Sequence, residues 1–492
     1  MNSEYPIRLS PPWSYQVLFL ILSVLGTFCC AAEDRIIDIA GNKQLFIDDA
    51  LIASSENIAF HVNPPVKTGE TTLAPDKPWE SASLNWFSVM EDDGKFRMWY
   101  ECYDIEGWPT PDDTSFCYAE SKDGVHWEKP ALGLYDYQGS RDTNILFRQI
   151  GPGGARSRVH GAGVFKDPAA PPEARYKAVS QGMFTGYDPP YRVAGMVSPD
   201  GWHWTRLSKP ICDVFADSQY SGWWDAAAGH YVLLGRVSGH GRAIGRSENP
   251  AFDTFPPLTL ALQTEAEVFP DADLYNPAAL HYPHADSVYF MFPSLYSHST
   301  DTLDIHLAVS RDGIHWSWPE QGKPFVALGD AGSFDSGSLY MGQGMIRSGN
   351  EIWMYYSGSS LKHNETELDA LVKPENRRIF SRVVCRLDGF VSIDAGEETG
   401  RFLTLPLKFE GAKLEVNLKT RAGGEVRIGL RDASGREVPG HTLEDCIPIA
   451  GDHVAKVVTW GIGTDLPTCA DTPVRLDVSM KNASLYAFQF VP

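Results

Sequence analysis

The sequence has little that favours a helical fold or a zinc site. No long stretch places apolar residues at the 3.6-residue spacing of an amphipathic helix, which argues against a predominantly helical fold. The eight cysteines form no Cys-x-x-Cys pair and no Cys/His spacing typical of zinc. We therefore expect another fold class, with no metal site and no cofactor.

Positive charge is also scarce. Lys and Arg total 42 against 63 Asp and Glu, so the formal net charge is −21, and the pI is near 5.1. A nucleic acid, an anionic lipid or a highly sulfated polymer would be repelled at long range by such a protein. We do not expect these partners, whereas a neutral or weakly charged glycan is compatible with the acidity.

A long apolar run occurs at the N-terminus. It extends from Val17 to Ala32 behind a single Arg and ends in small residues, the pattern of a secretory signal peptide. A single-pass anchor is the alternative, but the run is shorter than the roughly 20 residues that usually span a bilayer. We expect a signal peptide over residues 1–32 and a secreted or periplasmic protein without membrane contact after cleavage.

Aromatic residues and turn formers are abundant. Aromatic residues make up 12% of a chain that also holds 44 Gly and 34 Pro, a composition typical of turn-rich β proteins. The motif Ser-x-Asp-Gly-x-His-Trp occurs at 121–127, 198–204 and 310–316, and degenerate copies align on Ser247 and Cys385. The intervals between the five aligned positions are 77, 49, 63 and 75 residues, the size of one four-stranded blade with variable loops.

These repeats predict an all-β fold, with a five-bladed β-propeller at 33–396 followed by a β-sandwich at 397–492. The segment "KQLFIDDALIAS" (43–54) is expected to supply a strand that helps close the ring. Within the motif, Asp-Gly suits a tight connection and Trp suits packing between blades. We therefore interpret the motif, with its three His residues, as scaffold.

Several segments carry a resemblance to known proteins. "WESASLNW", "CYAESKDGVHWEKPALGLYDYQGSRDTNIL", "PPEARYKAV" and "LDGFVSIDAG" resemble a group of secreted bacterial proteins, frequent in planctomycetes, that is described as family-32-like. A secreted five-bladed propeller with a following sandwich is likewise similar to glycoside hydrolase families 32 and 43. The resemblance covers nearly all of the mature chain and implies a glycoside hydrolase with a glycan or oligosaccharide as its partner.

Family 32 enzymes carry three acids that this chain does not reproduce. The position of the nucleophile in Asn-Asp-Pro-Asn corresponds to Asn85 in "LNWFS". Asp167 in "KDP" imitates the Asp of Arg-Asp-Pro but is expected at a hairpin, and Glu101 in "ECY" imitates the Glu-Cys acid but lies in the first blade. The family's catalytic residues are therefore not transferred to this chain.

Site candidates come instead from the mouth of the central channel, where inner strands begin and second strands end. Glycoside hydrolysis needs one protonated carboxyl group and one ionised carboxylate, about 5 to 9 Å apart. The catalytic candidates are Asp217, Asp335, Asp273 and Glu101. The candidates for substrate binding are His160, Asn85, Asn276, Arg236, Trp86 and Tyr296.

Other interpretations stay open. The oxygens of "DADLYN" (271–276) suit calcium, but the segment lacks the Gly and Glu spacing of an EF-hand loop. The missing family-32 nucleophile favours a non-catalytic carbohydrate-binding propeller. A structural scaffold, whose channel mouth would hold no clustered acids, is the third class.

Overall fold

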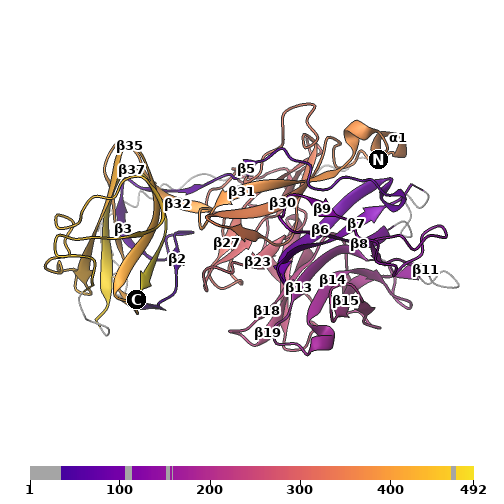
Figure 1. Ribbon diagram of the computed structural model, residues 1–492, viewed down its shortest axis with the longest axis horizontal. Coiled ribbons are helices and arrows are strands. Elements are labelled where there is room, and N and C mark those ends of the chain that lie inside the picture. Colours follow the sequence, from indigo (N-terminus) through magenta and orange to yellow (C-terminus); the bar gives the residue numbers. More distant parts are fainter. Residues whose placement is uncertain (1–34, 106–113, 151–155, 158, 467–471) are drawn as a thin grey trace, which may run out of the picture. The chain divides into compact units, whose positions relative to one another are not determined.

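Antiparallel β-sheets dominate the computed structural model, which describes residues 35–105, 114–150, 156–157, 159–466 and 472–492 (Figure 1). Residues 36–492 form one unit. The expected signal peptide at 1–32 lies outside the described residues. Within the described part, no helix is long and apolar enough to cross a bilayer.

Three sheets follow one another along the chain, each built from successive strands. The first consists of β6 (Ser83–Asp92), β7 (Lys95–Tyr103), β8 (Thr114–Ser121), β9 (Trp127–Glu128) and β10 (Ile145–Phe147). The second consists of β13 (His160–Lys166), β14 (Tyr176–Met183), β15 (Tyr191–Ser198), β16 (Thr205–Arg206) and β17 (Cys212–Phe215). The third consists of β18 (Ser221–Asp225), β19 (His230–Gly239), β20 (Gly241–Asn249) and β21 (Thr259–Leu262). Each has the meander pairing of a propeller blade.

Two further sheets take up the strands between residues 272 and 386. A three-stranded sheet consists of β23 (Ala279–His281), β24 (Tyr289–Met291) and β27 (Ala308–Ser310). An eight-stranded sheet consists of β22 (Ala272–Leu274), β25 (Ser294–Ser297), β26 (Thr302–Ile305), β28 (Ser338–Met341), β29 (Ile346–Ser348), β30 (Glu351–Ser359), β31 (Ile379–Arg386) and β5 (Val66–Lys67). In this sheet β26 and β28 pair in parallel at Leu303 and Ser338, so two groups of strands merge there.

A few short elements complete the part before residue 390. They are the two-stranded pair β11 (Gln149–Ile150) and β12 (Arg156–Ser157), the 3-10 helices η1 (Pro78–Glu80), η3 (Pro172–Ala174) and η4 (Pro374–Asn376), and the one-turn helix α1 (Leu368–Leu371). Both α1 and η4 lie in the connection between β30 and β31.

The inner strands of successive sheets lie side by side, which gives a propeller-like arrangement. Hydrogen bonds join one inner strand to the next, so the same ends of these strands meet around one axis. These bonds are Val164 N–H to Ser88 Oγ (3.0 Å), Tyr220 N–H to the Gly161 carbonyl (3.1 Å), Ala279 N–H to Ser221 Oγ (2.9 Å) and Val89 N–H to the Gln343 carbonyl (2.8 Å).

The repeated motif is a self-contained turn in each of its three clear copies. The motif Ser accepts a hydrogen bond from the Gly N–H at 2.9 Å, and the motif Asp accepts one from the His N–H at 2.8 Å. The second Asp oxygen lies 2.6 to 2.8 Å from His Nδ1. The carbonyl of the motif Gly accepts from another sheet in two copies: Tyr355 donates to Gly124, and Trp99 donates to Gly201, both at 2.7 Å. The motif therefore fixes a turn and ties neighbouring sheets together.

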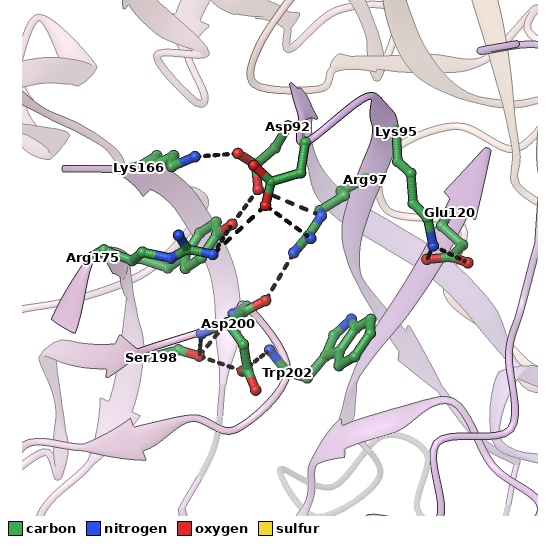
Figure 2. Close-up of polar contacts among 12 residues, drawn as sticks. Asp92, Lys95, Arg97, Glu120, Lys166, Arg175, Ser198, Asp200 and Trp202 are labelled. Carbon is green, nitrogen blue, oxygen red and sulfur yellow. Dashed lines mark hydrogen bonds and ion pairs between the residues drawn. The ribbon is translucent and has the colours of Figure 1, made fainter. Parts of the chain in front are cut away.

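Ion pairs reinforce the contact between the first and second sheets (Figure 2). The Asp92 carboxylate pairs with Lys166 of β13 and lies 3.6 Å from Nε of Arg97 in its own sheet. Arg97 in turn donates to the Asp200 carbonyl of the second motif copy at 2.8 Å, as Figure 2 shows. Because Asp92 is almost fully buried, these cations offset the cost of burying its charge.

The C-terminal region forms a ten-stranded sheet around two long neighbouring strands, β35 (Lys413–Asp432) and β37 (Val474–Val491) (Figure 1). Its other strands are β1 (Ile37–Ala40), β2 (Gln44–Leu45), β3 (Ile52–Glu56), β4 (Ala59–Val62), β32 (Val391–Ala395), β33 (Gly400–Thr404), β34 (Leu407–Phe409) and β36 (Asp452–Val457). Alternate residues of β37 are buried, and they join Phe402 and Trp460 in one apolar core.

The N-terminal segment corrects one expectation. "KQLFIDDALIAS" does not pair within the ring: β2 pairs with β37, and β3 pairs with β33 of the C-terminal sheet. The strand that joins the eight-stranded sheet from the N-terminal side is β5, which pairs with β31 through Val66 and Lys67. This strand follows the segment that was expected to pair there by about a dozen residues.

Candidate functional site

A cavity of about 290 Å³ opens where the inner strands begin. Residues from every part of the ring contribute to its wall, because the starts of those strands converge. The lining residues are Ala82, Ser83, Asn85, Trp86, Tyr103, His160, Asp217, Tyr275, Tyr340, Ser359, Leu361, Lys362, His363, Glu365, Thr366, Leu371, Asn376 and Arg378. Four of the ten predicted site residues are among them: Asn85, Trp86, His160 and Asp217.

Asp217 lies in the cavity wall just before β18, and its side chain is 37% exposed. One carboxylate oxygen pairs with Arg236 of β19, and the other accepts the Ser218 N–H at 2.9 Å and lies 3.8 Å from Nε2 of His160. Burial raises the pKa of Asp217, but the interactions with His160 and Arg236 outweigh it and hold the pKa well below its usual range. Asp217 is therefore ionised at neutral pH.

Glu101 stands behind His160 rather than in the cavity wall. This carboxylate is buried, and its oxygens lie 2.7 Å from His160 Nδ1 and 2.8 Å from the Gly161 N–H. A carboxylate only accepts hydrogen bonds, so His160 donates through Nδ1 and turns Nε2 toward Asp217. The Tyr103 hydroxyl, 2.9 Å from Nδ1, further fixes the ring. Glu101 thus acts on the cavity through His160.

Aromatic rings form one side of the cavity. The Trp86 and Tyr340 ring centres are 4.3 Å apart, and Trp86 and Tyr275 are stacked at 6.3 Å. Trp86 and Tyr340 are largely buried, whereas Tyr275 is partly exposed and carries the Arg236 guanidinium 4.2 Å above its ring. Tyr275 is therefore the ring most accessible to a ligand.

The long connection between β30 and β31 forms another side of the cavity. It supplies Lys362, His363, Glu365 and Arg378. His363 Nδ1 lies 3.1 Å from the Tyr340 hydroxyl, and burial together with the charge of Arg378 lowers the pKa of His363 to about 4. His363 is therefore neutral at physiological pH, while Glu365 adds a second carboxyl group to the cavity wall.

Two predicted catalytic residues, Asp273 and Asp335, do not line this cavity. Asp273 is buried and pairs with Arg242 at 2.6 Å and with His298 at 3.2 Å. Asp335 is buried and pairs with Lys67 of β5 at 2.6 Å. Cationic partners supplied by distant segments thus place both carboxylates in structural networks.

The remaining predicted binding residues lie around the cavity rather than in its wall. Tyr296 donates to Asp301 at 2.9 Å, and its ring centre is 4.9 Å from that of the lining residue His363. Asn276 is fully buried and its amide has no hydrogen-bond partner among the described residues. Arg236 acts on the cavity through its ion pair with Asp217.

Sequence reasoning missed Tyr275, Tyr340 and Arg378 as lining residues. Tyr275 directly follows β22 and is adjacent to the predicted Asn276, and neighbouring side chains of an extended chain point to opposite sides. If the neighbour of each predicted residue had also been taken as a candidate, Tyr275 would have been among the candidates. Arg378 lies at the end of the connection between β30 and β31, whose path cannot be predicted from the spacing of residues.

The calcium interpretation of "DADLYN" finds no support in the geometry. Asp271 accepts the Ser299 N–H at 2.7 Å, and Asp273 is paired with cations. Over the described residues, no cluster of three or more His, Cys, Asp or Glu side chains is arranged to hold a metal ion.

Known proteins are similar to this chain either over a short segment or at low sequence identity. No known protein-family profile matches the chain. Rv1502, an uncharacterized protein of Mycobacterium tuberculosis, is 30% identical over 148 residues, which are 29% of this chain and 40% of that protein. The chain thus spans about two fifths of the length of this curated relative.

Among solved structures, a glycosyl hydrolase from Bacteroides ovatus is similar over 67% of this chain and 94% of its own, with 14% identity and a TM-score of 0.45. An N-acetylgalactosamine deacetylase from F. plautii, in complex with blood group B trisaccharide, is similar over 66% of this chain and 94% of its own, with 16% identity and a TM-score of 0.43. Likeness at this level carries no conclusion about activity, which has to be argued from the cavity itself.

Proposed function

We propose that this chain is a secreted or periplasmic carbohydrate-active protein, a glycoside hydrolase that cleaves a neutral or weakly charged glycan in the cavity. One observation carries the proposal: the ionised carboxylate of Asp217 faces a cavity that is bordered by the partly exposed ring of Tyr275. An aromatic face combined with a few fixed polar groups is the usual composition of a small-molecule site. A sugar ring presents apolar C–H groups on its faces and hydroxyl groups at its edge, which suits this combination.

The proposed chemistry assigns one role to each carboxyl group in the wall. Asp217, held ionised by Arg236 and His160, either attacks the anomeric carbon or removes a proton from the attacking water. Glu365, the second carboxyl group of the wall, donates a proton to the leaving oxygen as the glycosidic C–O bond breaks. If Asp217 attacks, a water then breaks the bond between Asp217 and the sugar and gives its proton to Glu365, and Asp217 leaves as a carboxylate. If Asp217 acts as the base, the water adds to the anomeric carbon directly, and the proton that Asp217 takes is returned to solvent while Glu365 is reprotonated. In both cases water supplies the hydroxyl group of the new reducing end, so atoms and charge balance.

The proposed scaffold is a five-bladed propeller followed by a β-sandwich, related to glycoside hydrolase families 32 and 43. The expected bounds 33–396 and 397–492 change in one respect, because β1 to β4 and β32 pair in the C-terminal sheet. The hydrogen bond from the Val89 N–H of β6 to the Gln343 carbonyl, at 2.8 Å, supports ring closure, because it joins the inner strand of the first sheet to the segment after β28. The shared apolar core under β35 and β37 supports the sandwich, to which the N-terminal strands β1 to β4 add their edges.

A non-catalytic glycan-binding propeller is the second candidate. It is favoured by the ion pairs of Asp273 and Asp335, which remove two of the four predicted catalytic carboxylates from the cavity. It also accords with Asn85 at the position where family 32 enzymes have their nucleophile. Both candidates need a glycan in the cavity, and they differ only in whether a bond is broken.

A glycan-panel assay separates the candidates. The mature chain is incubated with neutral and acidic oligosaccharides, and new reducing ends and binding are both measured. New reducing ends from at least one glycan support the hydrolase, whereas binding without cleavage supports the second candidate. A panel that is neither bound nor cleaved contradicts both and leaves the scaffold class.

A further inference from the structure

Three arginines lie at or beside the cavity, and they differ in whether they form an ion pair with a carboxylate. Arg236 pairs with Asp217, and Arg242 pairs with Asp273 at 2.6 Å. Arg378, which lines the cavity directly, forms no ion pair with any carboxylate of the described residues. The cavity wall therefore contains one guanidinium whose charge is not compensated by any carboxylate of the described residues.

The surroundings of Arg378 hold it in place through neutral groups. Its Nη1 donates to the Ser338 carbonyl at 3.3 Å and to Ser357 Oγ at 3.2 Å, and its Nη2 donates to Ser338 Oγ at 2.6 Å. Its guanidinium also lies 4.9 Å from the centre of the Tyr340 ring. These contacts fix the orientation of the side chain without neutralising its charge.

The remaining donors of Arg378 match a planar anion. Nη1 already has two acceptors and Nη2 has one, whereas Nε has no acceptor among the described residues. Nε–H and the second Nη2–H are left, and two neighbouring N–H groups of a guanidinium form the fork that takes both oxygens of a carboxylate.

Arg378 also keeps its positive charge although burial makes that charge unfavourable. Burial lowers the pKa of the Arg378 guanidinium, but arginine remains protonated at neutral pH. A partly buried charge with no counter-ion among the described residues is destabilising, and an anionic ligand in the cavity would compensate it. Lys362, exposed in the same wall, adds a second positive charge.

We propose that the cavity selects a glycan that carries a carboxylate, as a uronic acid does, and that Arg378 binds this carboxylate through its unused N–H groups. The inference rests on the proposed function and narrows its substrate from weakly charged glycans in general to acidic sugars. A single carboxylate fits better than a phosphate dianion, because the ionised Asp217 lines the same cavity and repels a second negative charge more strongly. The acidic surface of the protein then opposes long polyanions while the cavity accepts one acidic sugar unit.

The test compares each glycan with its own uncharged form. Uronic-acid oligosaccharides are used beside the same oligosaccharides after carboxyl reduction, which leaves the linkages unchanged and replaces the carboxylate by an alcohol. Binding is measured by calorimetry with wild type, Arg378→Gln, Arg378→Lys and the surface control Arg436→Gln, whose side chain is 83% exposed. Thermal unfolding of each variant checks that it is folded.

Wild type and Arg436→Gln are expected to bind the acidic form about tenfold more tightly than the reduced form, the scale of a charge-assisted hydrogen bond. Arg378→Gln should lose that preference, measured as the ratio of its affinities for the acidic and the reduced form, so that a general change in affinity does not affect the result. Arg378→Lys should keep part of it, because the charge remains but the fork is lost. The wild-type comparison tests the preference for acidic sugars even if both Arg378 variants fail to fold, and Lys362→Gln then shows whether Lys362 rather than Arg378 provides it.

Three results overturn the inference in different ways. Equal binding of the acidic and reduced forms by wild type removes the acidic-sugar preference and leaves the proposed function standing. Absence of binding to every glycan of either form overturns both. A third arm adds inorganic phosphate: if phosphate binds in an Arg378-dependent way and the acidic form shows no advantage, the anion at Arg378 is phosphate and the proposal of a sugar carboxylate is wrong.

Discussion

Nε2 of His160 lies 3.8 Å from Oδ1 of Asp217, while Nδ1 of the same ring is held by the buried Glu101 carboxylate at 2.7 Å. Three residues from three different sheets or connections are thus arranged in a line that ends in the cavity. Glu101 thus orients the ring whose other nitrogen faces Asp217. Substitutions at Glu101 and at Asp217 should therefore both alter activity.

Glu101→Gln tests the role of Glu101 as a positioning residue. Glutamine keeps the shape but replaces one acceptor oxygen by an N–H group, so the hydrogen bond that orients His160 beside Asp217 is weakened and Asp217 loses part of what keeps its pKa low. We expect kcat/KM to fall at least about tenfold and the acid limb of the pH profile to move to higher pH. The exposed Glu173→Gln serves as control. An unchanged acid limb in a variant of reduced activity would show that Glu101 is merely structural.

Glu365→Gln tests the proposed proton donor. Activity on an oligosaccharide should fall by about 10² to 10⁴-fold, because the leaving oxygen is no longer protonated. Aryl glycosides with a dinitrophenyl leaving group need no such proton and should be cleaved at close to the wild-type rate. An equal loss on both kinds of substrate would contradict the assignment of Glu365.

His363 makes the stability of the protein depend on pH. Its folded pKa of about 4 lies below the ordinary value of 6.5, so between these pH values the unfolded chain binds more protons than the folded protein. The free energy of unfolding should therefore fall as the pH decreases from about 6.5 to 4. In denaturant titrations, His363→Gln should show a smaller fall than wild type and than the exposed control His240→Gln. Parallel pH curves for all three proteins would rule out this contribution.

Asp200→Ala tests the repeated motif as a structural element. The Asp200 carboxylate accepts the Trp202 and His203 N–H groups, both at 2.8 Å. Removing these acceptors should lower the free energy of unfolding by about 1 to 2 kcal/mol. The exposed control Asp253→Ala should lower it less, and cleavage per folded molecule should stay at the wild-type level for both. A large loss of activity in a stable Asp200→Ala protein would move the motif into the site.

The sequence allowed much of the scaffold to be predicted, because local rules govern it. The motif recurs at the same point of successive sheets, so it served as a ruler that led to Asp217, His160 and the strand starts of the cavity. The same rules failed for the N-terminal segment 43–54, since a strand-like sequence does not indicate which strand it pairs with.

The polar partners of the site could not be predicted in this way. Asp335 is paired with Lys67, which is 268 residues away in the chain, and no spacing rule signals such a pair. Arg378 and Glu365 reach the cavity from an irregular connection, whose path depends on tertiary contacts such as those of Arg378 with Ser338 and Ser357. Charge pairing and loop paths are properties of the folded chain.

The most direct test of the central claim is the cleavage rate of Asp217→Asn on the glycan that wild type cleaves fastest, measured beside the exposed control Asp213→Asn, whose side chain is 71% exposed. Asparagine keeps the size of the side chain but can neither attack the anomeric carbon nor take a proton from water. We predict that Asp217→Asn loses about 10² to 10⁴-fold in kcat while still binding the glycan, and that Asp213→Asn cleaves it at the wild-type rate. Cleavage by folded Asp217→Asn at the wild-type rate would contradict the account.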